Sequence, residues 1–152
     1  MKKYYLAYGS NLNMEEMKQR CPFSTPIGST AIKDYRLVFK GTKYTSYLTI
    51  EPCEGSIVPV GVYEITPMDE ANLDFYEGVP TFYSKETLTV ELYGEPIEAL
   101  VYIMNPLYSY NVPTTMYLSR CLEGYKSFRF NSKHLEVALE TTRSNIAKVL
   151  VK

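Results

Sequence analysis

The sequence contains no tryptophan, a single histidine and only three cysteines. Because His134 is the only imidazole, most histidine-based catalytic sites and most zinc sites are excluded. The odd number and wide spacing of Cys21, Cys53 and Cys121 predict neither a disulfide framework nor a zinc ribbon, so we expect reduced thiols. We therefore expect no metal site.

The chain also lacks a charge excess of either sign, since 16 basic and 17 acidic residues leave a net charge of −1. Such a surface has no strong field to hold a polyanion, so we predict no nucleic-acid partner and no binding to a membrane. No segment approaches the roughly 20 apolar residues that a membrane helix needs. The N-terminal MKKYYLAYGSN is too short for the core of a signal peptide, and we expect a cytoplasmic protein.

What the sequence has in excess is tyrosine, with 15 residues in a chain of 152 that is 45% hydrophobic. This length and composition suffice to bury one hydrophobic core without the help of metals or disulfides. No internal repeat, low-complexity tract or linker divides the chain. We predict a single α+β domain over residues 1–152.

The N-terminal segment predicts a strand, a tight loop and a helix. Tyr4–Tyr8 is a short and bulky apolar run, which is typical of a buried strand. Asn13 is a favourable N-cap with Glu16 in the capping-box position, and this pair predicts a helix from Met14 to about Cys21. The loop Tyr8–Asn11 then leaves a strand and enters the start of a helix.

Alternation and capping signals predict the remaining elements. Strands are expected at Ile27–Phe39, Tyr47–Ile50, Val58–Val62, Thr87–Leu92 and Ile97–Ile103, and helices at Pro67–Tyr76, at Thr114–Gly124 and after a cap at Asn131 or Ser132. Because proline cannot donate a backbone hydrogen bond, Pro59 predicts that the third of these strands lies at a sheet edge or contains a bulge. Gly94 and Glu95 are expected to form the two-residue turn of a hairpin. We expect loops at Pro52–Ser56 and Asn105–Val112.

The loop Tyr8-Gly9-Ser10-Asn11-Leu12 is the first candidate binding site. Glycine allows a sharp turn and a close approach of the backbone to a ligand. The unpaired N–H groups at the start of the next helix suit a carboxylate or a developing oxyanion, and Ser10 and Asn11 would add side-chain donors. The alternative is that Gly-Ser-Asn only makes a strand-to-helix turn.

Glu77, at the end of the predicted second helix, is the candidate acid–base residue. Neighbours such as Tyr76 and Val79 would desolvate its carboxyl and raise its pKa toward neutrality, where one group can both accept and donate a proton. The alternative is a solvated acid, although the helix dipole disfavours a negative charge at that end.

Together these two segments resemble the γ-glutamylcyclotransferase superfamily, which includes the AIG2-like small proteins. Its members carry a Tyr-Gly-Ser-Asn-Leu loop, or a related one, after the first strand and a catalytic glutamate in a Leu-Asp-x-x-Glu-Gly segment. Here these appear as YGSNL at Tyr8–Leu12 and LDFYEG at Leu73–Gly78. Tyr83, after the glutamate, and the PTTMY helix start that ends at Tyr117 also match. The resemblance implies a small mixed β-barrel with helices packed around it.

The resemblance also implies an activity of the acyltransferase or lyase type, the cofactor-independent conversion of a γ-glutamyl amino acid or γ-glutamyl amine to 5-oxoproline and the free amine. It implies that Glu77 is the general base and then the general acid. The small-molecule γ-glutamyl substrate would then contact Tyr8, Gly9, Ser10, Asn11, Leu12, Tyr83 and Tyr117. The Ser-Asn form of the loop is closer to the branch that acts on γ-glutamyl amino acids than to the Tyr-Gly-Thr-Leu branch that acts on γ-glutamylamines.

Two other functions stay open at this point. The chain could be a non-catalytic module that binds a glutamate-like or amine ligand, or it could hydrolyse an amide to free glutamate. Ser10 is disfavoured as a nucleophile because no histidine or lysine is evident nearby to activate it. The identity of the leaving amine and the oligomeric state are left open, with a homodimer among the alternatives.

Overall fold

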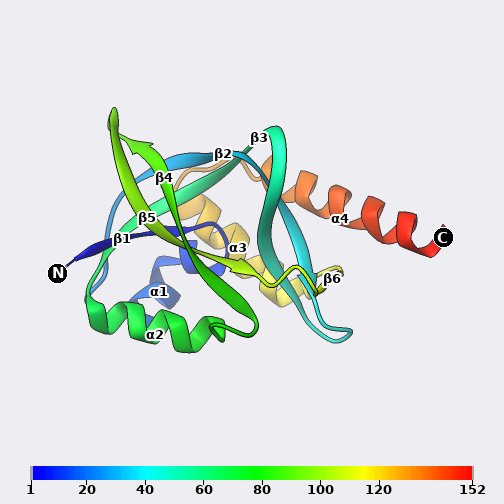
Figure 1. Ribbon diagram of the computed structural model, residues 1–152, viewed down its shortest axis with the longest axis horizontal. Helices are drawn as coiled ribbons and strands as arrows, with labels where there is room; N and C mark the ends of the chain where they lie inside the picture. The colour runs from blue at the N-terminus through cyan, green and yellow to red at the C-terminus, as the bar shows by residue number, and fades with distance from the viewer. Residues whose placement is uncertain (1, 152) are drawn as a thin grey trace.

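The computed structural model describes residues 2–151. In chain order its elements are β1 (Lys3–Ala7), the 3-10 helix η1 (Ser10–Leu12), α1 (Met14–Arg20), β2 (Thr25–Gly41), β3 (Ser46–Ile65), α2 (Pro67–Glu77), β4 (Tyr83–Leu92), β5 (Glu95–Met104), β6 (Ser109–Tyr110), α3 (Thr115–Ser127) and α4 (Lys133–Val151). The strands form one mixed sheet in the order β4-β5-β1-β3-β2-β6, in which β1 runs parallel to β5 and antiparallel to β3. The sheet curls into a half-barrel with four helices around it (Figure 1), which confirms the predicted α+β fold.

The two longest strands, β2 and β3, form one long hairpin that makes a large part of the curved wall (Figure 1). The loop predicted at Pro52–Ser56 was wrong, because β3 continues through these residues. The register nevertheless jumps there, from the pair Lys33 and Ile57 to the pair Tyr35 and Pro52. The hairpin absorbs the extra residues as a bulge, in which the Gly55 N–H donates to Asp34 Oδ1 at 3.0 Å.

Pro59 was predicted at a sheet edge or bulge, yet β3 lies inside the sheet between β1 and β2. The proline is tolerated because β1 pairs only with Gly61–Ile65 of β3. At Pro59 the strand has only β2 beside it, through the pair with Ala31. The missing N–H of proline therefore interrupts no pairing with β1.

The predicted hairpin between β4 and β5 is present, but its turn lies one residue earlier than expected. Tyr93 and Gly94 form the turn, with φ angles of 52° and 81°, and two left-handed residues are typical of a type I′ hairpin. The Tyr93 hydroxyl donates to the carbonyl of Ile27 on β2 at 2.7 Å. This bond links the turn to β2 across the opening of the half-barrel. The predicted loop at Asn105–Val112 also contains a short strand, β6, which pairs with the end of β2.

The first two helices begin at their predicted caps. The Asn13 side chain accepts from the Glu16 N–H, and Thr66 and Asp69 form a capping box around Pro67. The second helix ends at Glu77, because Gly78 takes a left-handed conformation with φ 66°. These signals place the candidate carboxyl at the very end of α2.

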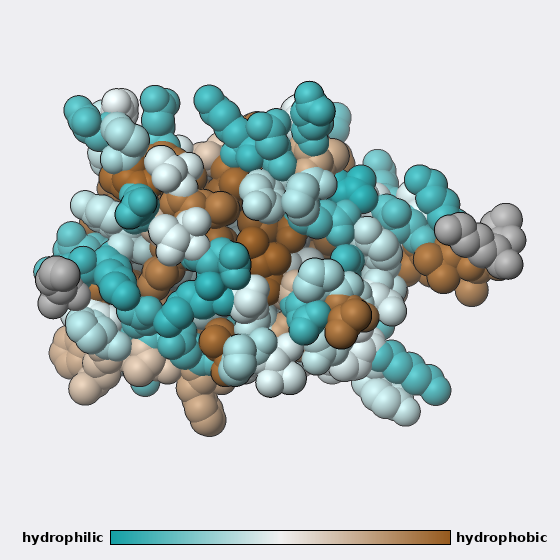
Figure 2. Space-filling model, in the orientation of Figure 1, coloured by the Kyte–Doolittle hydropathy of each residue, from teal (hydrophilic) through white to brown (hydrophobic). Residues whose placement is uncertain are grey.

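The last two helices cover different parts of the sheet and loop. Gly124 of α3 lies directly against η1, so close that a β-carbon there would come within 2.6 Å of Leu12. Thr142 of α4 accepts a hydrogen bond from the Phe39 N–H of β2 at 2.9 Å. The C-terminal turns of α4 extend beyond the sheet (Figure 1), where the exposed side chains of Val149 and Leu150 give an apolar surface (Figure 2). Within residues 2–151, no helix is long and apolar enough to cross a membrane.

Candidate active site

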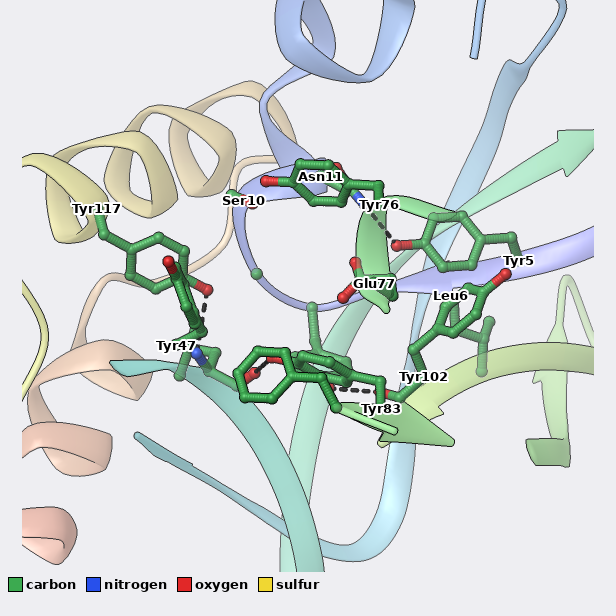
Figure 3. Close-up of a pocket in the computed structure, with 14 residues that line it drawn as sticks. Tyr5, Leu6, Ser10, Asn11, Tyr47, Tyr76, Glu77, Tyr83, Tyr102 and Tyr117 are labelled. Atoms are coloured by element: carbon green, nitrogen blue, oxygen red, sulfur yellow. Dashed lines mark hydrogen bonds between the residues drawn. The ribbon is translucent and has the colours of Figure 1, made fainter. Parts of the chain in front are cut away.

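A cavity of about 300 Å³ opens where the end of β1, the loop after it and the end of α2 meet. Its walls come from four strands (β1, β3, β4 and β5) and three helices (η1, α2 and α3), and half of the residues that form them are tyrosines. The lining residues are Tyr5, Leu6, Tyr8, Gly9, Ser10, Asn11, Tyr47, Leu48, Tyr76, Glu77, Phe82, Tyr83, Tyr102 and Tyr117 (Figure 3). Seven of the 15 tyrosines of the sequence therefore line this one cavity.

The structure brings the two predicted motifs to this cavity. Glu77 at the end of α2 and the segment Tyr8–Asn11 after β1 line it together, with Tyr83 and Tyr117. Figure 3 shows the Glu77 carboxyl pointing into the space between Ser10 and Asn11 on one side and the strand tyrosines on the other. Leu12 lies outside the lining, because its side chain is fully buried beneath the loop. That these residues bind a substrate remains a prediction.

The loop offers fewer backbone donors than its sequence suggested. The Leu12 N–H donates to the Gly9 carbonyl at 3.0 Å, and the Asn13 N–H donates to the Ser10 carbonyl at 2.9 Å. The N–H groups of Gly9, Ser10 and Asn11 have no acceptor in the described part of the chain. These three groups are backbone donors of the loop that remain for a ligand.

The Asn11 side chain is used to hold the loop in place. Its Nδ2 donates to the Tyr5 hydroxyl at 2.8 Å (Figure 3), and its Oδ1 accepts from Nη1 of Arg20. The Asn11 carbonyl accepts from the Tyr63 hydroxyl at 2.9 Å. One of the two N–H donors of the Asn11 side chain is therefore already engaged with the protein.

Three of the tyrosine hydroxyls in the walls are anchored to the backbone. Tyr8 donates to the Tyr102 carbonyl at 2.5 Å and Tyr83 donates to the Leu48 carbonyl at 2.8 Å. The Tyr117 hydroxyl accepts from the Leu48 N–H at 3.0 Å. Burial raises the pKa of Tyr8 and Tyr83 above the ordinary tyrosine value, so both stay neutral. Because their protons are engaged, the oxygens of Tyr8 and Tyr83 remain as acceptors.

One end of the cavity is aromatic. The ring of Tyr47 lies edge-on to those of Phe82 and Tyr117, with centroid separations of 6.0 and 5.0 Å. Such edge-to-face pairs hold rings in defined positions. This end can accommodate an apolar or polarisable group of a ligand.

Glu77 is the carboxyl group of the cavity lining, and its side chain is partly buried. Burial raises its pKa to about 7, while the positive charge of Arg20 acts in the opposite direction. Within residues 2–151 the carboxyl takes part in no hydrogen bond or ion pair of the protein itself. At neutral pH it can therefore both accept a proton and return one.

Several residues of the cavity were not predicted from the sequence. Tyr5 and Tyr102 reach it because β1 and β5 pair in parallel, a long-range pairing that no local pattern encodes. Tyr47 reaches it from the start of β3. Arg20 does not line the cavity, but its charge reaches Glu77. The one local feature that pointed to Arg20 was a cation in the last turn of α1. A cation there is equally explained by its favourable interaction with the helix dipole.

None of the three cysteines lines the cavity. Cys21, Cys53 and Cys121 are free thiols, of which the first and last are buried. Burial raises the pKa of each of those two thiols to about 12, which disfavours the nucleophilic thiolate. Among residues 2–151, no three histidine, cysteine, aspartate or glutamate side chains are grouped so that they could hold a metal.

The raised pKa of Glu77 predicts that Glu77→Gln stabilises the fold in a pH-dependent way. In the folded protein Glu77 keeps its proton up to about pH 7, whereas an unfolded glutamate loses it near pH 4.5. Ionisation of Glu77 therefore lowers the free energy of unfolding of the wild type as the pH rises from about 4.5 to about 7. Glutamine is neutral throughout. We expect equal stability near pH 4 and a gain for the variant of about 1–3 kcal/mol above pH 7, measured by urea unfolding.

The control for this measurement is Glu98→Gln, which removes a carboxyl exposed on β5. That variant should show no comparable gain at high pH. A Glu77→Gln variant with the same stability difference from wild type at pH 4 and pH 8 would contradict the raised pKa.

Comparisons with known proteins agree with this architecture. A family model described as "Gamma-glutamyl cyclotransferase, AIG2-like" matches residues 5–137. A solved structure described as a gamma-glutamyl cyclotransferase is 24% identical, with a TM-score of 0.82 over 91% of this chain and 86% of the other. An uncharacterised protein from Homo sapiens is also 24% identical, with a TM-score of 0.80 over 90% and 86%.

A more distant solved structure, an AIG2-like protein from Mus musculus, is 20% identical, with a TM-score of 0.58 over 77% of this chain and 82% of the other. At these identities the structural likenesses show a common fold. No curated protein sequence matches the chain.

Proposed function

The chain belongs to the gamma-glutamyl cyclotransferase, AIG2-like family, and we propose that it converts a γ-glutamyl amino acid or γ-glutamyl amine to 5-oxoproline and the free amine. The observation that carries the proposal is the position of Glu77. A carboxyl with a pKa of about 7 lies in the same cavity as the loop whose Ser10 and Asn11 N–H groups are free to bind an anion. A volume of about 300 Å³ is at the lower end of the range for small-molecule sites.

The reaction needs no nucleophile from the protein, because the substrate supplies its own. The α-amine of the glutamyl group attacks the γ-carbonyl carbon, a C–N bond closes the five-membered ring, and the bond to the leaving nitrogen breaks. Holding the substrate in a folded, near-attack geometry supplies part of the acceleration, up to about 7–11 kcal/mol in ideal intramolecular cases. In this reaction the attacking nitrogen goes from an ammonium to the ring N–H and so loses two protons, while the leaving nitrogen gains one to depart as a neutral amine. The enzyme's remaining task is to carry out these proton transfers.

Glu77 is the residue that we assign to these transfers. As a carboxylate it accepts the proton that the α-ammonium must lose before its nitrogen can attack. As a carboxylic acid it then gives this proton to the leaving nitrogen when the tetrahedral intermediate collapses. The carboxylate formed again in this step accepts the second proton, which the ring nitrogen loses, and releases it to solvent. A pKa of about 7 makes these transfers accessible at neutral pH.

The loop and the tyrosines are assigned complementary binding roles. The N–H groups of Ser10 and Asn11 would bind an anionic part of the substrate, either the α-carboxylate or the developing oxyanion, and one well-aimed donor is worth about 3 kcal/mol to a transition state. The acceptor oxygens of Tyr8 and Tyr83 suit the α-ammonium. The leaving group would then lie toward the aromatic end formed by Tyr47, Phe82 and Tyr117.

The test is a substrate panel in which γ-glutamyl amino acids, γ-glutamylamines and glutathione are each incubated with the protein. We expect 5-oxoproline and the free amine to appear in equal amounts from at least one class. A protein that is stabilised by these ligands against thermal unfolding but releases no 5-oxoproline from any of them would be a binding module. That result would overturn the proposed activity.

A further inference from the structure

Arg20, the last residue of α1, contacts both halves of the candidate site although it does not line the cavity. Its Nη1 donates to Asn11 Oδ1, and its Nη2 donates to the Tyr76 hydroxyl at 2.6 Å. Its guanidinium carbon also lies 3.6 Å from the centroid of the Tyr76 ring. The Arg20 side chain is only 16% exposed, whereas Tyr76, which it contacts, is 47% exposed.

The residues that Arg20 contacts are the sequence neighbours of the residues to which we assign the chemistry. Asn11 follows Ser10 and shares the loop whose N–H groups are free, and Tyr76 precedes Glu77 at the end of α2. The backbone of Arg20 is held as well, because Asn72 of α2 donates to its carbonyl at 3.0 Å. One residue therefore connects the loop after β1 with the helix end that carries the carboxyl.

We propose that Arg20 is a positioning residue of this site, which fixes the loop at Asn11 relative to the helix end at Tyr76 and directs a positive charge toward the Glu77 carboxylate. The proposal rests on the proposed role of Glu77. Arg20 belongs to neither the YGSNL loop nor the LDFYEG segment, but it connects the two physically.

Arginine suits this role better than lysine. Its planar fork carries five N–H donors and remains charged at all relevant pH values, so it can serve Asn11, Tyr76 and Glu16 together. Glu16, one turn earlier on α1, accepts from Nη2 at 2.9 Å and orients the fork. A lysine would keep the charge but would hold fewer of these partners.

Arg20 is also the charged neighbour to which the Glu77 carboxyl responds. Burial raises the pKa of this carboxyl and the Arg20 charge lowers it. The other titratable groups near the carboxyl are tyrosines from four elements: Tyr5 and Tyr8 of the β1 segment, Tyr76 of α2, Tyr83 of β4 and Tyr102 of β5. The pKa of each is raised, so these groups are neutral where Glu77 titrates.

The test compares Arg20→Met, which removes the charge and the fork, with Arg20→Lys, which removes only the fork. In Arg20→Met we expect kcat/KM to fall by up to about 100-fold, and the acid limb of its pH profile to move to higher pH. In Arg20→Lys we expect the limb to stay near its wild-type position while KM rises. Arg120→Met is the matched control, because Arg120 also approaches Glu16, at 3.9 Å, but forms no hydrogen bond with Asn11 or Tyr76 in the described residues.

A second readout does not depend on activity. The Glu77 carboxyl carbon, assigned from its loss in Glu77→Gln, is titrated by ¹³C NMR in each variant, and its midpoint should rise in Arg20→Met but not in Arg20→Lys or Arg120→Met. An unchanged midpoint in Arg20→Met, or equal midpoints in Arg20→Met and Arg20→Lys, would overturn the proposal. Because the titration needs no substrate, it decides the role of Arg20 even if the substrate panel yields no 5-oxoproline and the proposed function fails.

Discussion

Glu77→Gln is expected to lower kcat for 5-oxoproline release by about 10²–10⁴-fold, the usual contribution of a general acid–base residue, and to leave KM within a few-fold. Glutamine has nearly the same shape as glutamate, so the cavity should keep its form. It cannot take the proton from the α-ammonium or return one to the leaving nitrogen. The measurement is steady-state turnover on whichever member of the substrate panel the wild type accepts.

The pH profile gives the same prediction in a second form. The wild-type value of kcat/KM should fall about tenfold per pH unit below pH 7, because protonation removes the carboxylate that acts as the base. The residual activity of Glu77→Gln should lack this limb, whereas Glu98→Gln should reproduce the wild-type rate and profile. Wild-type turnover by Glu77→Gln would show that another group moves the proton.

Gly124→Ala is expected to lower the free energy of unfolding by about 1–3 kcal/mol, the range for overpacking a close-packed site. A β-carbon at this position of α3 would lie 2.6 Å from the carbonyl carbon and Cβ of Leu12 and 2.7 Å from the Asn13 nitrogen. Two of these atoms belong to the backbone that follows the substrate loop, so relief of the clash must move that loop. We therefore also expect KM to rise, measured together with unfolding in urea.

The sign of this effect makes the test decisive. In an unobstructed helix interior, replacing glycine by alanine stabilises by about 1 kcal/mol, so a loss of stability reports the contact with the loop. Ser119→Ala, at an exposed position of the same helix, should change stability by less than about 0.5 kcal/mol. Stabilisation by Gly124→Ala would contradict the close packing of α3 on this loop.

Local chemistry predicted much of the fold, because many of its boundaries are set by single residues. Asn13 and Pro67 start their helices as expected, and Gly78 ends α2 at Glu77. The incorrect predictions lie where the pairing of strands far apart in the sequence determines the local structure. The β2 and β3 hairpin carries the strand through Pro52–Ser56, and the β4–β5 turn places Tyr93 in a left-handed conformation that residue preferences do not favour.

The site was predicted from its two motifs but not from its surroundings. Glu77 and the Gly9–Asn11 loop stand out because unusual residues lie at the ends of regular elements. Tyr5 and Tyr102 do not, because an inward-facing tyrosine on a strand has the same pattern whether it fills a core or lines a cavity. Which of the 15 tyrosines face the site depends on the order of strands in the sheet.

The most direct test of the account is the identity of the product formed in ¹⁸O-labelled water. Cyclisation by the substrate's own amine predicts 5-oxoproline without ¹⁸O from the solvent, together with one equivalent of free amine, as measured by mass spectrometry immediately after the reaction. Free glutamate that carries solvent ¹⁸O at its γ-carboxyl would show that water, rather than the α-amine, attacks the γ-carbonyl. That result would contradict the proposed reaction.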